Sequence, residues 1–187
     1  MVKATHLTTP LRDAVIEKLR IGERVLISGT LFTARDAAHK RMTKLLEEGI
    51  PLPFDIKGAL IYYVGPTPPK PGEVIGSAGP TSGYRMDSYT PALIAEGLKG
   101  MIAKGARGKE VIEAMKKYKA VYFVATGGAG ALISKAIKKS EIVAYEDLGT
   151  EAIRKLEVED FPALVANDIH GNDLYELGRK QYKKHYK

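Results

Sequence analysis

The sequence predicts an α/β domain with a mixed sheet. Short apolar segments of strand character alternate along the chain with segments of helical spacing, which is the pattern of an α/β fold. Some of the strand-like segments are apolar almost throughout, as expected for strands that are covered on both faces. With 187 residues, 44% of them hydrophobic, the chain can bury a substantial core, so we expect one domain over residues 1–187.

The N-terminal part predicts a helix, a strand and a second helix. Apolar residues at helical spacing predict a helix over 11–20, and the run 24–32 predicts a strand. A second helix is predicted over 34–48. Thr33 stands where an N-cap would, and Asp36, three residues later, is placed to reach back toward it.

The start of this second helix carries the first candidate site residue. Arg35 lies in the first turn, where a cation is slightly unfavourable against the helix dipole unless it binds an anion there. His39 and Lys40 follow on the same helix. We interpret Lys40 as part of a solvated face and favour a structural role for His39.

A strand over 58–65 is nearly all apolar, which indicates burial on both faces. Residues 66–71 contain four prolines and predict an extended connector. The connector leads into a loop over 76–87, where three glycines and a proline exclude ordinary helix or strand.

The loop over 76–87 is the most informative stretch of the sequence. Thr81 and Ser82 supply two hydroxyls, Arg85 a guanidinium and Asp87 a carboxylate. Glycine lets a backbone approach a small ligand closely, and arginine binds a carboxylate through two parallel hydrogen bonds. The loop is therefore a candidate carboxylate-binding site, and a surface turn with an incidental arginine is the equal alternative.

The middle of the chain predicts a helix and a second candidate site. Thr90 and Pro91 mark the start of a short helix that continues to residue 99. Residues 101–105 then form a buried segment with one charged residue, Lys104. The amine of Lys104 is a candidate for a site, and a lysine that reaches solvent by its stem explains the pattern equally well.

The next elements surround a glycine turn at 126–130. We expect a helix over 109–118, a strand over 120–125 and a helix over 131–139. The order resembles a phosphate-binding loop, but the pattern G-x-x-x-x-G-K-[ST] is absent, and the dinucleotide pattern requires glycine where Ile133 stands. We favour close packing of helix against sheet as the reason for these glycines.

The C-terminal third completes the sheet. Strands are predicted over 142–145, within 152–164 and over 163–166. Residues 167–173 bring acids and an imidazole together, and a turn rich in Asn, Asp and Gly explains them better than a metal site. A final helix begins at Leu174.

Composition excludes several functions. The chain has no cysteine, so it contributes no disulfide, thiol nucleophile or cysteine-ligated metal or iron–sulfur site. It has no run of 18 apolar residues and no apolar signal-peptide core, so we expect a cytoplasmic location and no membrane partner.

The net charge of +7 is concentrated at one end. The last nine positions contain five basic residues: Arg179, Lys180, Lys183, Lys184 and Lys187. Without these five charges the net charge of the chain is 7 − 5 = +2. A localised basic tail is typical of a solvated helix end, whereas a nucleic-acid interface needs a basic stripe along one face. We therefore disfavour nucleic acid as a partner.

These motifs together resemble one known family. Motifs similar to those of the β subunit of class I fumarases and the related L-tartrate dehydratases occur, in order, at 29–30, 33–41, 79–82, 85–87 and 103–105. The similarity covers almost the whole chain, including 127–129 and 171–173. One departure lies in the loop, where the fumarase pattern has a small residue and this chain has Tyr84.

The resemblance implies a swivelling three-layer β/β/α domain that closes over an α subunit bearing a [4Fe–4S] cluster. Carried over by position, Arg35, Arg85 and Lys104 are implied to bind the carboxylates of a small dicarboxylate substrate. Thr81, with Ser82 beside it, is implied to lie near the proton on the carbon next to a carboxylate. Threonine is a weak base, so it needs nearby positive charge or a relay partner to take that proton.

The implied function is that of the β subunit of a hetero-oligomeric hydro-lyase that interconverts (S)-malate and fumarate. Removing the proton builds a second negative charge on the adjoining carboxylate, and fixed cations stabilise this transition state more than the ground state. The β subunit of an L-tartrate dehydratase is the alternative. A non-catalytic module that binds through the basic tail is the alternative of another class.

Overall fold

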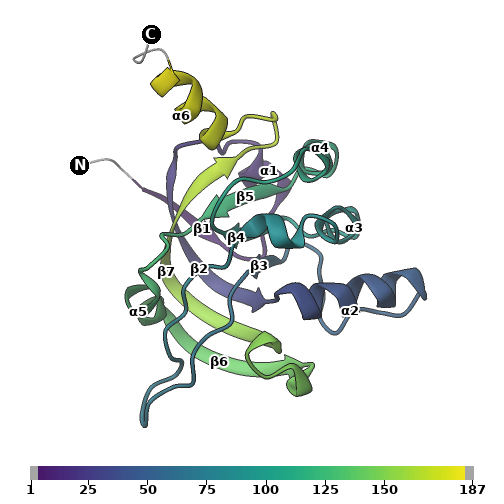
Figure 1. Cartoon of the computed structure of the whole chain (residues 1–187), viewed down its shortest axis with the longest axis vertical. Helices are drawn as coiled ribbons and strands as arrows, with labels where there is room; N and C mark the ends of the chain where they lie inside the picture. Colours follow the sequence, from purple (N-terminus) through teal and green to yellow (C-terminus); the bar gives the residue numbers. More distant parts are fainter. Residues whose placement is uncertain (1–3, 184–187) are drawn as a thin grey trace.

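The computed structural model describes residues 4–183, which form one seven-stranded mixed sheet with helices (Figure 1). The strands are β1 (Thr5–Thr8), β2 (Arg24–Thr33), β3 (Leu60–Tyr62), β4 (Gly100–Ala103), β5 (Val121–Val124), β6 (Ile137–Ala144) and β7 (Ile153–Asn167). Their order is β1-β2-β3-β4-β5-β7-β6, and an additional pairing of β2 with β7 closes the middle of the sheet into a barrel-like form. The predicted α/β composition and mixed sheet are confirmed.

The parallel strands of the sheet have their carboxyl ends at the same edge. Strands β1 to β5 pair in parallel, so β2, β3, β4 and β5 all end on the same side of the sheet. Strand β7 runs antiparallel to β2, β5 and β6. Residues that directly follow the four parallel strands therefore lie near one another, although they are far apart in the sequence.

The helices connect the parallel strands. They are α1 (Asp13–Ile16), α2 (Asp36–Glu47), α3 (Thr90–Ala95), α4 (Lys109–Tyr118), α5 (Gly130–Ile133) and α6 (Leu174–Lys183), with the 3₁₀ segments η1 (Gly83–Met86), η2 (Ser134–Ala136) and η3 (Glu146–Glu151). Parallel strands require crossover connections, and α2, α3 and α4 supply them between β2 and β5. Figure 1 shows these three helices together on one side of the sheet.

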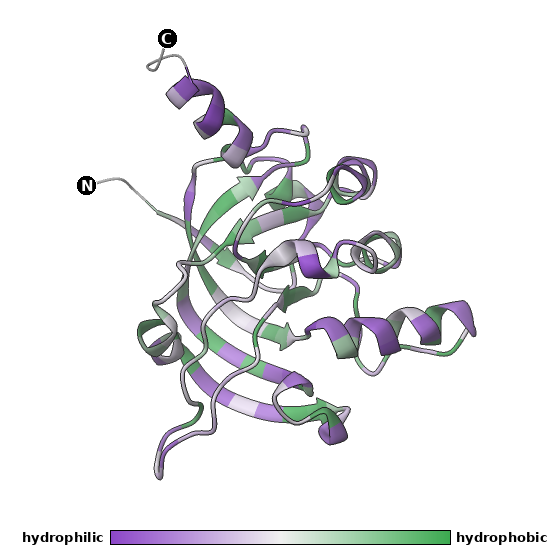
Figure 2. Cartoon of the chain, in the orientation of Figure 1, coloured by the Kyte–Doolittle hydropathy of each residue, from purple (hydrophilic) through white to green (hydrophobic). Residues whose placement is uncertain are grey.

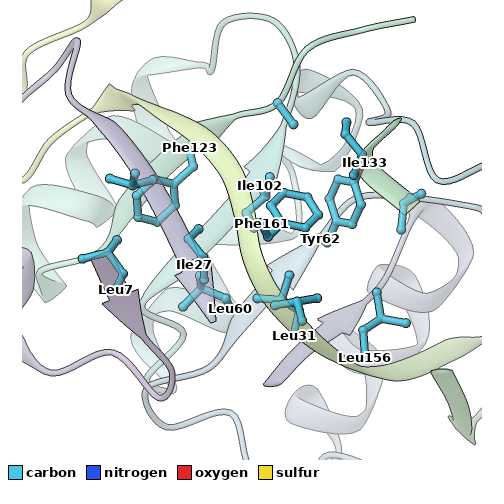
Figure 3. Close-up of a cluster of buried hydrophobic side chains, with 14 of the residues drawn as sticks. Leu7, Ile27, Leu31, Leu60, Tyr62, Ile102, Phe123, Ile133, Leu156 and Phe161 are labelled. Atoms are coloured by element: carbon cyan, nitrogen blue, oxygen red, sulfur yellow. The ribbon is translucent and has the colours of Figure 1, made fainter. Parts of the chain in front are cut away.

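Alternate strand residues face two separate cores. In β3 and directly after it, Leu60 and Tyr62 belong to the cluster inside the barrel (Figure 3), whereas Ile61 and Tyr63 pack against the helices. All four side chains are buried, which confirms that this segment is covered on both faces. Figure 2 shows apolar residues in the central strands and hydrophilic residues along α2 and α6.

The predicted elements differ from the structure mainly where long-range pairing competes with local pattern. The helix predicted over 131–139 is wrong beyond residue 136, because Ile137 begins β6 and pairs with Val158 of β7. The helix predicted over 11–20 is reduced to α1. Strand β1 was not expected, and α4 has the predicted bounds.

The predicted N-cap of α2 is also wrong. Thr33 is the last residue of β2, and its hydroxyl donates to the Ala152 carbonyl and accepts from the Arg154 N–H. Arg35 occupies the N-cap position, without a side-chain hydrogen bond to the helix. The threonine thus bonds to the start of β7 rather than to its own helix.

The segment 167–173 is a hydrogen-bonded turn. Asp168 accepts hydrogen bonds from the backbone N–H groups of His170 and Asn172 and from the Asn172 side chain. Among residues 4–183 no group of three or more His, Cys, Asp or Glu side chains is placed to hold a metal ion. The hydrogen bonds to Asp168 show that this segment forms a turn, as the sequence predicted.

Two further findings concern possible membrane helices and the basic C-terminal tail. No helix within the described part of the chain is both long and apolar enough to cross a membrane. Arg179, Lys180 and Lys183 lie on α6, whereas Lys184 and Lys187 of the basic tail lie outside the described residues.

Candidate active site

The predicted site residues lie where the parallel strands end. Arg35 follows β2 by two positions, and Lys104 directly follows β4. Thr81 and Ser82 belong to the loop after β3. Ligands of α/β sheets bind at the carboxyl ends of the strands, so the topology places these residues at the edge where a site is expected.

Backbone hydrogen bonds fix Thr81 and Ser82 beside Lys104. The Thr81 N–H donates to the Tyr63 carbonyl at 2.7 Å, and the Lys104 N–H donates to the Thr81 carbonyl at 3.0 Å. The Gly83 N–H donates to the Lys104 carbonyl at 2.8 Å, which completes a parallel bridge between Ser82 and Lys104. The loop is therefore held like a short additional strand, and it brings three of the predicted residues together.

The polar groups of these three residues are available to a ligand. Thr81 and Ser82 are half-buried, and their hydroxyls make no hydrogen bond to any described residue. Lys104 is exposed, and its Nζ has no hydrogen-bond or ion-pair partner within residues 4–183. Its stem passes Gly127, where an added Cβ would lie 3.5 Å from Cδ of the lysine.

Arg85 already has a carboxylate partner in this chain. From η1 it donates through Nε to Oδ1 of Asp36 at 3.0 Å, and its Nη2 lies 2.8 Å from Oδ2. This is the two-pronged geometry that the sequence predicted for a substrate carboxylate. The Asp36 side chain thus binds Arg85 instead of reaching back to cap α2.

Arg35 is held by a second carboxylate. Its Nη2 lies 3.3 Å from Oε1 of Glu151, and Oε2 of Glu151 accepts a hydrogen bond from the Ala37 N–H at 3.0 Å. The side chain of Arg35 is 22% exposed, and its Nε is buried without a hydrogen-bond partner among the described residues. Glu151 lies 116 positions along the chain from Arg35, and the sequence alone gave no signal for this pair.

His39 supports the backbone of Arg35. It is fully buried, and desolvation lowers its pKa from 6.5 to about 4, so the ring is neutral near pH 7. Its Nδ1 lies 2.9 Å from the Arg35 carbonyl oxygen, and its ring meets that of Tyr63 edge to face at 4.9 Å between centroids. The neutral ring donates from Nδ1, which agrees with the structural role favoured from the sequence.

A buried ion pair that the sequence did not reveal fastens the loop to α4. The side chain of Arg107 is 0% exposed and donates from Nε to Oδ1 of Asp87 at 2.7 Å. The other oxygen of Asp87 accepts from the Gly108 N–H, and Nη2 of Arg107 donates to the Thr90 hydroxyl. Asp87, the predicted loop carboxylate, is therefore structural. A buried pair of this kind fixes geometry, because removing one partner leaves an uncompensated charge.

The glycine turn at 126–130 packs against the same loop. A Cβ at Gly130 would collide with Oγ of Ser77 and lie 2.8 Å from the Gly79 nitrogen. The Ala78 N–H donates to the Gly130 carbonyl at 3.1 Å. Close packing was predicted, but the partner is the loop over 76–87 and not the face of the sheet.

Two of the cations at this edge of the sheet are exposed, namely Lys104 and Arg85. Five cavities of about 400–690 Å³ among the described residues are lined by other residues than Arg35, Thr81, Arg85 and Lys104. The edge presents an ammonium, two hydroxyls and two guanidinium groups. These groups suit binding of a carboxylate-bearing small molecule.

The structure is an α/β domain with cations and hydroxyls at one edge of its sheet, and comparison with known proteins assigns its family. The chain belongs to the family described as Fumarase C-terminus, which matches residues 1–178. The resemblance inferred from the sequence motifs is confirmed.

Three relatives illustrate the range of similarity. The chain is 43% identical to "Fumarate hydratase 2" of Leishmania major over 157 residues, which cover 83% of this chain and 28% of that protein. It is 40% identical to "Fumarate hydratase class I, aerobic" of Escherichia coli K12 over 174 residues, 91% of this chain and 32% of that protein. It is 32% identical to "L(+)-tartrate dehydratase subunit beta" of Escherichia coli K12 over 181 residues, 94% of this chain and 89% of that subunit. The chain thus spans about a third of the two fumarate hydratases and most of the tartrate dehydratase subunit.

The Arg35 side chain packs against Gly65, so a methyl group at this position should disturb it. A Cβ at Gly65 would collide with Nη1 of Arg35 and lie 3.1 Å from the Thr150 carbonyl oxygen. In the Gly65→Ala variant we expect the flexible guanidinium to move, with a small change in thermal stability and about a 10-fold loss of kcat/KM in the assembled enzyme.

The matched control for this variant is Gly178→Ala on α6, where an added Cβ meets no atom within 4 Å. Steady-state kinetics and thermal unfolding of both variants check the prediction. Normal kcat/KM in a folded Gly65→Ala enzyme would contradict a role for the Arg35 position.

Proposed function

We propose that this chain is the β subunit of a hetero-oligomeric hydro-lyase that interconverts (S)-malate and fumarate. The observation that carries the proposal is the parallel bridge that fixes Thr81 and Ser82 beside Lys104 at the carboxyl edge of the sheet. Membership in the fumarase C-terminal family and the 40% identity to a class I fumarate hydratase support it.

The residues of this chain bind and orient the dicarboxylate in the proposed reaction. Lys104, Arg35 and Arg85 supply positive charge to the substrate carboxylates. Loss of the proton from the carbon next to a carboxylate builds charge on that carboxylate, so these cations stabilise the transition state. Thr81 is the proposed proton-transfer group, with its hydroxyl free of protein partners among the described residues.

The iron–sulfur cluster belongs to the partner in this proposal. The chain has no cysteine, and its described residues hold no group of three or more metal-binding side chains, so they do not fit a cluster. The proposed α subunit would hold a [4Fe–4S] cluster, which supplies Lewis acidity toward the substrate hydroxyl and carboxylate. This chain would contribute cations and hydroxyls from the other side of the substrate.

We also propose that the domain is the swivelling β/β/α unit of such enzymes and closes onto its partner in the cytoplasm. The two separate cores, one inside the barrel-like sheet and one beneath the helices, support a layered arrangement. The exposed character of Lys104 and Arg85 supports a site that a second subunit completes.

The β subunit of an L-tartrate dehydratase is the second candidate. The tartrate dehydratase relative is 32% identical to this chain over 89% of its own length, which supports this candidate. Tyr84, which departs from the fumarase motif, is 65% exposed beside Arg85. Turnover of fumarate, mesaconate and tartrate by the assembled complex separates the two candidates.

The decisive experiment is reconstitution. We expect the purified chain to fold but to show no hydratase activity, because it has no Lewis acid of its own. Mixing it with an anaerobically prepared cluster-bearing α subunit should restore turnover of fumarate. Appreciable dehydratase activity of the iron-free chain alone would refute the proposal, as would a correctly assembled complex that turns over none of the three substrates.

A further inference from the structure

The two candidate substrate-binding arginines are connected through carboxylates of this chain. Asp36 binds the fork of Arg85, and Glu151 binds Arg35 while also accepting from the Ala37 N–H. Because Arg35 and Asp36 are consecutive, four charges of alternating sign run from Glu151 through Arg35 and Asp36 to Arg85. We refer to these four residues as the charge network.

The charge network joins three separate segments of the fold. Asp36 begins α2, Arg85 lies on η1 in the loop after β3, and Glu151 ends η3 just before β7. The side chains are between 22% and 39% exposed, so water screens the network only in part. Glu151 therefore holds Arg35 and Asp36 holds Arg85, at positions that are partly shielded from water.

Each arginine keeps donors that the network does not use. Nε of Arg35 is buried and lacks a hydrogen-bond partner among the described residues. Arg85 uses Nε and Nη2 toward Asp36, and its Nη1 makes no hydrogen bond within residues 4–183. A buried donor without a partner is costly, so the unused N–H of Arg35 indicates a position where an acceptor is to be supplied.

We propose that Asp36 and Glu151 are positioning residues of the reaction, and that both carboxylates also lower the affinity for the dianionic substrate. This inference rests on the proposed function. The two carboxylates fix the guanidinium groups in the orientation that the transition state requires. They also repel a dicarboxylate ion, since a like charge nearby disfavours it. Turnover and ground-state binding should therefore respond to their removal in opposite directions.

The test uses the assembled enzyme and succinate, a dicarboxylate that cannot react. In Asp36→Asn we expect kcat to fall by about 10- to 100-fold through loss of orientation, while the inhibition constant of succinate also falls because a repelling charge is removed. Asp36→Glu keeps the charge but moves it by one methylene, so kcat should fall and the inhibition constant should remain unchanged. Glu151→Gln, which keeps an acceptor for the Ala37 N–H, should reproduce the effect of Asp36→Asn through Arg35.

Asp147→Asn is the matched control. Asp147 forms a two-pronged pair with Arg41, which also joins η3 to α2, but it lies outside the charge network. Its variant should keep both kinetic constants. Thermal unfolding identifies any variant that fails to fold, and Glu151→Gln then tests the inference independently of Asp36.

The possible results separate this inference from the proposed function. A wild-type complex without turnover refutes the proposed function. An active wild-type complex whose folded Asp36→Asn and Glu151→Gln variants keep normal kcat refutes only the inference. A weaker succinate affinity in parallel with the loss of kcat also refutes it, because the carboxylates would then support binding rather than oppose it.

Discussion

Replacing Thr81 by alanine is expected to remove about 100-fold or more of kcat, the usual contribution of a positioned proton-transfer group, with a modest change in KM. The backbone of Thr81 is fixed on both sides, through its N–H to Tyr63 and through its carbonyl to Lys104. Loss of the hydroxyl should therefore change the chemistry without moving the loop. Thr81→Ser keeps the hydroxyl and should keep much of the activity.

A different result would assign Thr81 a different role. If its hydroxyl only orients the substrate, Thr81→Ala should cost about 1 to 2 kcal/mol, roughly 5- to 30-fold, much of it in KM. Exchange of the substrate C3 proton with solvent deuterium gives an independent measurement. An alanine variant that exchanges this proton at the normal rate would exclude Thr81 from proton transfer, and the base would have to come from the partner subunit.

Replacing Arg35 or Arg85 by lysine should lower kcat/KM by about 30- to 1,000-fold, which corresponds to roughly 2 to 4 kcal/mol. Lysine keeps the positive charge but lacks the planar fork. For Arg85 the change also breaks the two-pronged contact with Asp36. The variant therefore loses both the fork that binds the substrate carboxylate and the contact that orients this side chain.

Arg41→Lys is the control for both variants, because Arg41 makes a comparable two-pronged pair with Asp147 farther along α2. Steady-state kinetics of the assembled enzyme, together with thermal unfolding, decide the outcome. Near-normal kcat/KM in folded Arg35→Lys and Arg85→Lys variants would end the proposal of a carboxylate clamp.

The site was predictable to the extent that it depends on strand ends and loop composition. Sequence reasoning singled out Arg35 as a cation in the first turn of a helix, Thr81 as a hydroxyl in a glycine-rich loop and Lys104 as the one charge of an apolar segment. The parallel strands then place all three near one edge of the sheet. The hydroxyls and the single arginine of the loop over 76–87 were visible as a polar group within a glycine-rich segment. Neither signal contains information on which partner each charged group has.

The partners depend on contacts across the fold. Arg85 pairs with Asp36, 49 positions away, and Arg107 pairs with Asp87, 20 positions away. Sequence reasoning assigned Asp36 to a helix cap and counted Asp87 among the polar groups of a candidate binding loop, since local spacing was the only guide. Glu151 carried no local signal at all, because only the docking of η3 against α2 brings it to Arg35.

By itself, the sequence determined the α/β class, the buried strands, the bounds of α4 and the motifs that relate the chain to its family, because each follows from local periodicity or residue order. The tertiary structure alone decided that β7 closes the sheet onto β2, that residue 137 begins a strand and that Thr33 bonds to the start of β7. It also decided that both candidate arginines are bound by carboxylates of this chain. These features depend on the pairing of segments that are distant in the sequence, and a local pattern cannot specify which distant partner a strand or a charge will meet.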